Sequence, residues 1–275
     1  MNALAVRDDL ATRTLLSKSA LNVADICGNK AWMEIHHRRP FIGNPDVTFG
    51  SAVDAAVEQV LKAIAAGIPL GAAQPMEAAA EIVERDGIAI HMEEVEAAIT
   101  DFVRDILPAH DWTDCILQAH LNVVMDGWGE CDGHPDIVLR SDACWDVKTS
   151  KRARETARTV ELGLYALMIE ATTGRPVPEV GYLTRVRTKT PSWQTLSTPV
   201  TDEFRDWTRE HVDGFVRARR ADELLNRNAP EPINWTFPSG PKNSGLCRTC
   251  QYNPMFGGTC RMAVRDPLPA GGDEG

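Results

Sequence analysis

Two short apolar segments near the middle of the chain carry charged side chains, within the run GHPDIVLRSDACWDVKTS at 133–150. Asp136 begins the first segment, and Asp146 and Lys148 lie in the second. Because an unpaired charge is costly to bury, these groups require a compensating partner. Two carboxylates on neighbouring strands can bind one Mg²⁺ ion, and a nearby ammonium can stabilise charge on a phosphate. The alternative interpretation is a plain Asp–Lys ion pair at a sheet edge, with Asp136 only starting a strand.

The alternation of side chains along a strand predicts how the second charged segment is oriented. Successive residues of an extended strand point to opposite faces of the sheet. Asp146 and Lys148 are therefore expected on one face, with Trp145 and Val147 packed on the other. This arrangement predicts a metal held by the carboxylates and a lysine beside it as a catalytic group.

The elements that must position these residues follow from hydrophobic periodicity and from turn residues. Helical patterns cover 17–38, 50–67, 75–85, 91–106, 155–173 and 201–225. Strand patterns cover one segment within 115–129, then 136–139, 143–149, 180–188 and 192–200. This order of helices, three strands, helix, two strands and helix predicts an α/β core with a mixed sheet.

Composition limits the kind of protein that this chain can be. Its 275 residues, 43% of them hydrophobic, are enough for one α/β domain or a domain with an added lobe. We expect a cytoplasmic protein, because no secretory signal and no run of roughly 20 apolar residues is found. The net charge of −10 argues weakly against nucleic-acid binding. Basic clusters nevertheless occur, as at Lys151, Arg152 and Arg154, where the alternative is a solvated surface.

Cysteine spacing near the C-terminus indicates a second metal site. Cys247 and Cys250 have the two-residue spacing of a metal clamp, and Cys260 follows across a Gly-Gly pair. Cys27 in the first helical segment could supply a fourth thiolate, the alternative being a packed helix thiol. Four thiolates suit zinc or an iron–sulfur cluster, and either would join the two ends of the chain.

The charged run resembles the PD-(D/E)XK nuclease superfamily, with a literal Pro135-Asp136 followed by Asp146-Val147-Lys148. By this resemblance Asp136, Asp146 and the backbone carbonyl of Val147 would be ligands of Mg²⁺ or Mn²⁺. Lys148 would assist the hydrolysis.

Two further motifs resemble the RecB-like branch of that superfamily. Glu161-x-x-x-Tyr165 stands where the branch has Q-x-x-x-Y, a motif that would add these two residues to the catalytic site. Gly50-x-x-x-Asp54 stands where the branch has G-x-x-x-H with a metal-binding His, so Asp54 would be a ligand. Glu58, one turn later on the same helix face, is the alternative ligand.

The cysteines resemble the iron–sulfur staple of AddB-type and CRISPR-associated members of this branch. A Ser-x-Ser motif precedes Cys27, and the other three cysteines follow near the C-terminus. The resemblance implies a [4Fe–4S] cluster on Cys27, Cys247, Cys250 and Cys260, with Zn²⁺ as the alternative. The last interval is longer than the family's usual five residues.

The resemblance implies a restriction-endonuclease-like core, a mixed sheet flanked by helices, whose N- and C-terminal segments are joined by the four-cysteine cluster. We expect a helical part over 1–110 and a nuclease core over 111–225. A Cys-rich cluster segment over 226–263 and a disordered tail over 264–275 would follow.

The expected function is a Mg²⁺- or Mn²⁺-dependent DNA exonuclease acting on single-stranded or free ends. Lys151, Arg152 and Arg154 would attract the phosphate backbone. Such a protein would work in phage recombination or a CRISPR-adaptation-like process, in the cytoplasm of a bacterial or phage-infected cell, as a homo-oligomer or with a partner protein. Two other classes stay open: a catalytically degenerate DNA-end-binding or assembly protein on the same fold, and a zinc-stapled protein-interaction module.

Overall fold

The computed structural model describes residues 16–37, 44–69, 71, 73–233, 250 and 252. The chain forms two compact units, Gly43–Glu210 and the two ends Met1–Ile42 with His211–Gly275. Both ends of the chain thus belong to one unit, whereas the predicted division followed the order of the sequence. No helix among the described residues is long and apolar enough to cross a membrane.

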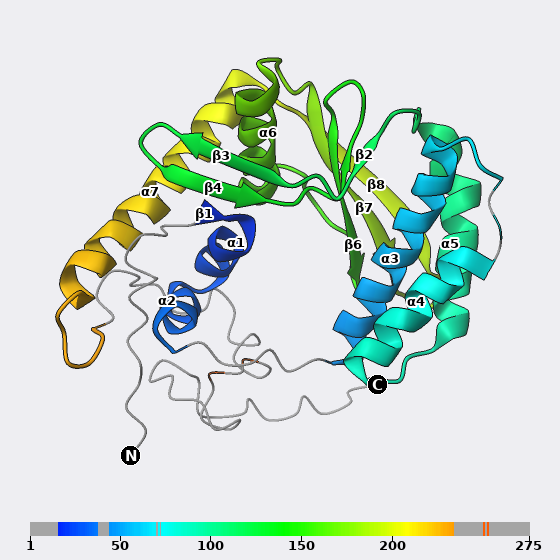
Figure 1. Cartoon of the computed structure of the whole chain (residues 1–275), viewed down its shortest axis with the longest axis horizontal. Coiled ribbons are helices and arrows are strands. Elements are labelled where there is room, and N and C mark those ends of the chain that lie inside the picture. Colours follow the sequence, from blue (N-terminus) through cyan, green and yellow to red (C-terminus); the bar gives the residue numbers. More distant parts are fainter. Residues whose placement is uncertain are drawn as a thin grey trace, which may run out of the picture. The chain divides into compact units, whose positions relative to one another are not determined.

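A five-stranded mixed sheet forms the centre of the unit Gly43–Glu210 (Figure 1). Its strand order is β2-β5-β6-β7-β8, in which β6 and β7 run parallel and the other neighbours antiparallel. The bounds are β2 Ile116–Leu117, β5 Ile137–Val138, β6 Cys144–Ser150, β7 Glu179–Val186 and β8 Ser192–Pro199. The predicted α/β class with a mixed sheet flanked by helices is confirmed.

Helix α6, Val160–Thr173, connects the parallel strands β6 and β7. Thr159 caps it by accepting a hydrogen bond from the Leu162 amide at 3.3 Å, and Gly174 ends it at a φ of 68°. The helix begins later than the predicted 155–173, because Thr159 is the residue that caps it. Nearly all side chains in its first ten residues are buried, as expected of a helix between a sheet and another helix.

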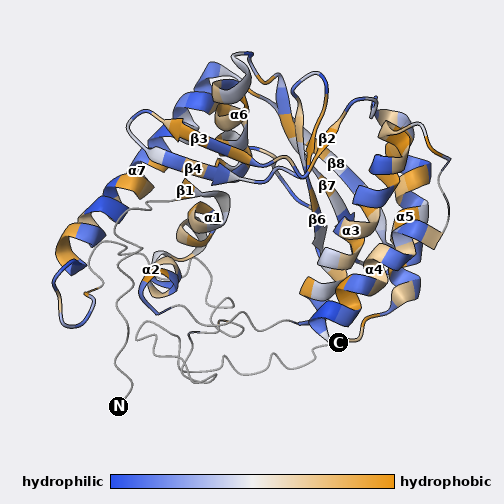
Figure 2. Ribbon diagram, viewed as in Figure 1, coloured by the Kyte–Doolittle hydropathy of each residue, from blue (hydrophilic) through white to orange (hydrophobic). Residues whose placement is uncertain are grey.

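Helix α3, Pro45–Ala65, packs on one face of the sheet (Figure 1). It starts before the predicted 50–67 because Asn44 caps it and Pro45 suits its first turn. Apolar and polar residues alternate along its length (Figure 2), and the apolar ones form a core with Trp145 and Val147 of β6.

Two more helices complete this layer. They are α4, Ala73–Asp86, and α5, Met92–Asp101. The predicted 91–106 holds only in part, because α5 continues as a wider π-helical turn, Phe102–Ile106, and a short 3₁₀ turn, Leu107–Ala109. Their apolar residues join the core of α3 and the sheet.

Helices α6 and α7 carry the core on the other face of the sheet. Cys144 and Tyr182 of the sheet pack with Tyr165 of α6 and with Phe204 at the start of α7, Asp202–Asn226. Thr201 caps α7, accepting a hydrogen bond from the Phe204 amide at 3.2 Å.

The segment predicted as one strand within 115–129 forms parts of two sheets. Gln118 adopts a φ of 47°, which interrupts the extended backbone after β2. Strand β3, Leu121–Met125, then pairs antiparallel with β4, Gly129–Gly133. Gly127 and Gly129, in and after the turn that connects these two strands, have φ values of 76° and 91°, which glycine adopts readily.

In the other unit a short strand, β1 Leu16–Ser17, precedes helices α1, Lys18–Ile26, and α2, Gly28–His36. The prediction of one helix over 17–38 is wrong, because Cys27 adopts extended backbone angles, φ −158° and ψ 102°. Its Sγ instead caps α2 by accepting a hydrogen bond at 3.4 Å from a backbone amide in the first turn.

A small apolar cluster ties the N-terminal helices to the C-terminal residues of this unit. Trp32 and Met33 of α2 pack with the fully buried Tyr252, and Cys250 and Phe215 adjoin them. Side-chain packing therefore joins helix α2 to Cys250 and Tyr252 near the C-terminus.

Candidate active site

Asp136 and Asp146 come together because of the register of β5 and β6. Ile137 pairs with Trp145, so the next position in the ladder sets Asp136 opposite Asp146. The carboxylate of Asp136 accepts a hydrogen bond from the Val147 amide at 2.7 Å, which holds it against β6. The main sheet therefore places the two predicted acids side by side.

Lys148 and Asp146 form an ion pair on one face of β6. Asp146 has no exposed surface, whereas the Lys148 side chain is 27% exposed, so the ammonium faces the solvent side of a buried carboxylate. Trp145 and Val147 lie in the core on the opposite face. The predicted alternation of these four residues is confirmed.

The surroundings of Asp136 favour its neutral form. Burial raises the pKa of this carboxyl to about 8, and the neighbouring carboxylates of Asp146 and Asp54 raise it as well. Lys148 opposes the shift without cancelling it. The three carboxylates outnumber the one ammonium. The site therefore carries an excess of negative charge, which favours the binding of a further cation.

The structure distinguishes between the two acids predicted on α3. Asp54 lies close enough to Asp136 to raise its pKa. Glu58 instead pairs with Lys62, one turn along the helix, at 2.7 Å. Of these two acids of α3, Asp54 is therefore the one that acts on Asp136.

Glu161 of α6 reaches the same group of charges. It is buried, and its Oε1 lies 3.9 Å from the Lys148 ammonium. Its Oε2 accepts a hydrogen bond from the Tyr182 hydroxyl at 3.2 Å. Lys148 is thus placed between two acids, Asp146 on its own strand and Glu161 on the helix that follows.

Tyr165 holds the segment that leads into Asp136. Its ring is fully buried, and its hydroxyl donates a hydrogen bond to the His134 carbonyl at 2.7 Å. Its hydroxyl is therefore bound to the backbone two residues before Asp136.

Residues that the sequence did not single out complete the site. Tyr182 of β7 is the register partner of Asp146, and Thr184 is that of Lys148. The Thr184 hydroxyl is buried and has no hydrogen-bond partner within the described part of the chain. No local pattern marks these residues, because their role comes from the pairing of β6 with β7.

Of the three basic residues predicted to attract DNA, Arg154 contacts Tyr182, the register partner of Asp146. Its guanidinium is stacked over the Tyr182 ring, 4.0 Å from the centroid. Gln194 of β8 fixes its backbone through hydrogen bonds of 2.8 and 2.9 Å. Lys151 pairs with Asp46 at 2.7 Å, and Arg152 is exposed.

Two of the four predicted cluster cysteines, Cys27 and Cys250, are described, and Cys247 and Cys260 lie outside the described residues. Cys27 is half-buried and lies at the N-terminus of α2. Cys250 is half-buried beside the cluster of Trp32 and Tyr252.

Comparison with known proteins shows the fold only. No family model matches this sequence, and no curated protein matches it. The crystal structure of a "putative exonuclease" from Eubacterium rectale aligns over 85% of this chain and 96% of its own, with 11% identity and a TM-score of 0.50. The crystal structure of SSO0001 aligns over 86% and 94%, with 10% identity and a TM-score of 0.32, too low to carry an argument. The chain thus shares the fold of the Eubacterium rectale protein.

Proposed function

We propose that this protein is a metal-dependent nuclease that hydrolyses phosphodiester bonds in DNA. The observation that carries the proposal is the convergence of Asp136 and Asp146 of the central sheet, and Asp54 of α3, beside Lys148. The chain shares the fold of the Eubacterium rectale protein. That protein is called an exonuclease in its name only, and the shared fold supports a nuclease here.

The donor set suits a hard divalent cation. Asp54, Asp136 and Asp146 offer carboxylate oxygens, and Val147 offers its backbone carbonyl, which are the ligands that Mg²⁺ and Mn²⁺ prefer. Burial first, and then the charges of Asp146 and Asp54, raise the pKa of Asp136 to about 8, so a bound cation would stabilise its ionised form. Such an ion, when bound, would supply Lewis-acid chemistry to the phosphate group.

The protein's own groups orient the substrate and balance its charge. The Lys148 ammonium, held between Asp146 and Glu161, would face the phosphate and stabilise the negative charge that develops there. The hydroxyl of Tyr182 fixes Glu161 and so limits where Lys148 can move. Arg154, stacked on the same tyrosine, would attract the adjoining phosphate.

The finer part of the proposal rests on the sequence resemblance. It is exonuclease action at single-stranded or free ends, in phage recombination or a CRISPR-adaptation-like process, by a RecB-like protein. A homo-oligomer or a recombination partner belongs to the same proposal. If the protein binds DNA ends but does not cut them with Mg²⁺ or Mn²⁺, the catalytically degenerate end-binding alternative replaces it.

A four-cysteine [4Fe–4S] cluster is the second part of the proposal, with Zn²⁺ as the alternative. Its support is the capping geometry of Cys27 and the packing of the Cys250 segment against the same helix. Anaerobic purification followed by absorption spectroscopy and iron and zinc analysis tests it. Cys27→Ala should remove the iron and its colour together, and a colourless zinc protein would replace the cluster by the alternative.

The nuclease proposal is tested with DNA substrates labelled at one end, single- or double-stranded, in EDTA, Mg²⁺ or Mn²⁺. Cleavage should require the ion, and Lys148→Ala should slow it by about 100-fold or more, the usual cost of losing one group that stabilises transition-state charge. The matched control is Lys189→Ala, a lysine in the exposed connection between β7 and β8. Unchanged cleavage by Lys148→Ala would refute the enzyme assignment.

A further inference from the structure

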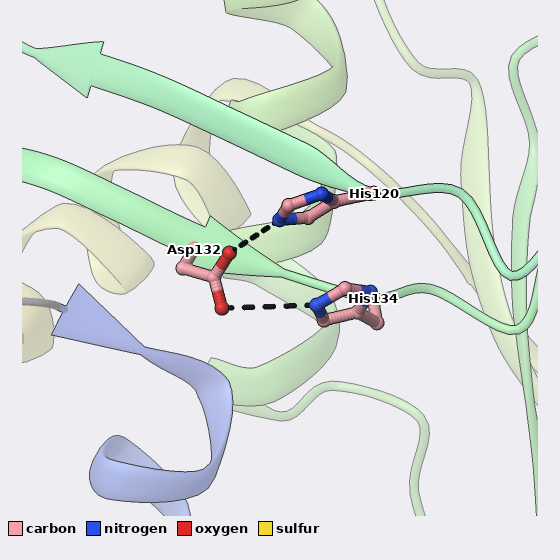
Figure 3. Close-up of side chains that lie close together, drawn as sticks. All are labelled: His120, Asp132 and His134. Carbon is pink, nitrogen blue, oxygen red and sulfur yellow. Dashed lines mark hydrogen bonds and ion pairs between the residues drawn. The ribbon is translucent and has the colours of Figure 1, made fainter.

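A second group of potential metal ligands lies on the hairpin of β3 and β4, within the unit Gly43–Glu210. It consists of His120, Asp132 and His134 (Figure 3). The Nε2 atoms of His120 and His134 lie 2.8 and 3.8 Å from the two oxygens of the Asp132 carboxylate. One ligand atom of each residue lies within 4.8 Å of the other two.

The backbone ladder, rather than chance, brings these side chains together. Leu121 pairs with Gly133, so the next step of the ladder sets His120 opposite His134. Asp132 precedes His134 by two residues and therefore shares its face of the strand. The two imidazole rings stack in parallel, with centroids 4.4 Å apart and planes 9° apart.

The other face of the hairpin anchors this arrangement to α6. A Cβ on Gly133 would lie 3.0 Å from the Tyr165 ring and 3.2 Å from Met168 Sδ, so β4 lies tightly against the helix. Tyr165 also donates its hydrogen bond to the carbonyl of His134. The ligand side chains thus extend from a packed backbone and not from a loose loop.

Two imidazole nitrogens and one carboxylate make a donor set different from that of the Asp136 group. Imidazole suits Zn²⁺, Co²⁺ and Ni²⁺, whereas Mg²⁺ favours oxygen ligands. Three protein ligands leave positions for water, as in many zinc sites. The histidine side chains are 60% and 54% exposed, so an ion from solution can reach them.

We propose that His120, Asp132 and His134 bind one divalent transition-metal ion of the zinc class. The site is separate from the proposed nuclease centre and does not rest on that function. Because His134 precedes Asp136 by two residues, the bound ion would also restrain the segment that enters the nuclease centre. Without a metal, Asp132 is hydrogen-bonded to His120 and lies 3.8 Å from the Nε2 atom of His134.

The test is a titration of the EDTA-treated full-length protein with Co²⁺ and then with Zn²⁺ in competition. At a metal concentration that fills the wild-type sites, the wild-type protein should bind one more ion than His120→Ala or His134→Ala. The affinity of the hairpin site for the ion should fall by more than about tenfold in each variant. His91→Ala is the matched control, since His91 is exposed and makes no capping hydrogen bond with its side chain. Thiolate-bound Co²⁺ has a distinct charge-transfer absorption, so binding at the cysteines is counted separately.

A second measurement needs no variant. In ¹⁵N-labelled wild-type protein, Zn²⁺ should shift the side-chain nitrogen resonances of His120 and His134 and leave those of His91 unchanged. Equal ion counts in all variants, together with unshifted resonances, would overturn the proposal. Asp136→Asn should retain this ion, so failure of the hairpin site and failure of the nuclease centre are distinguishable.

Discussion

Asp136→Asn changes one atom of the charged cluster and should stabilise the metal-free protein at neutral and alkaline pH. Asp136 is half-buried, and the burial of its carboxyl and the neighbouring carboxylates raise its pKa from 3.8 to about 8. Asn keeps the side-chain shape and an oxygen that can accept the hydrogen bond from the Val147 amide. The substitution therefore removes the titration and leaves the local packing in place.

The direction of the pH dependence follows from proton binding. Above about pH 4 the unfolded chain has lost the proton of Asp136, whereas the folded protein keeps it until about pH 8. The folded state binds more protons over this interval, so rising pH favours unfolding. One pKa unit corresponds to about 1.4 kcal/mol, which sets a ceiling of about 6 kcal/mol for the loss of stability across the whole interval.

Urea unfolding in EDTA at about pH 5 and about pH 8 measures this loss. The free energy of unfolding of the wild-type protein should fall between about pH 5 and about pH 8. Because local relaxation reduces the cost of a buried charge, we expect it to fall by at least about 1 kcal/mol more in the wild type than in Asp136→Asn. Asp126→Asn, in the exposed turn of the hairpin, should follow the wild-type protein. Equal declines in wild type and Asp136→Asn would refute the placement of Asp136 in a buried acidic cluster.

Three further substitutions test other parts of the structure. Gly181→Ala should destabilise the protein by about 2 kcal/mol in urea unfolding, because the new Cβ would lie 2.8 Å from the Leu196 carbonyl across β7 and β8. Tyr165→Phe should cost about 1 kcal/mol in the same assay and slow cleavage without weakening DNA binding, because it removes only the hydrogen bond to His134. Arg154→Ala should weaken DNA binding and reduce the slope of log affinity against log salt by about 1, measured by fluorescence anisotropy; an unchanged slope would contradict its contact with phosphate.

Local sequence patterns were sufficient where one strand or one helix end decides the outcome. The alternation within β6 placed Asp146 and Lys148 on one face, and the helical pattern over 201–225 begins at the residue that caps α7, Thr201. Each depends on the geometry of a few consecutive residues. By contrast, Cys27 interrupts a helical pattern that periodicity alone could not divide, because its thiol competes for a backbone amide.

The sequence by itself determined which residues could do chemistry in this protein, and the tertiary structure decided which of them meet. Periodicity marked both Asp54 and Glu58 on one helix face, but the packing of α3 on the sheet brought Asp54 to Asp136. Strand pairing placed Tyr182 beside Asp146 and also created the group at His120. Side-chain faces follow from local backbone geometry, whereas register and helix placement depend on contacts between residues far apart in the chain.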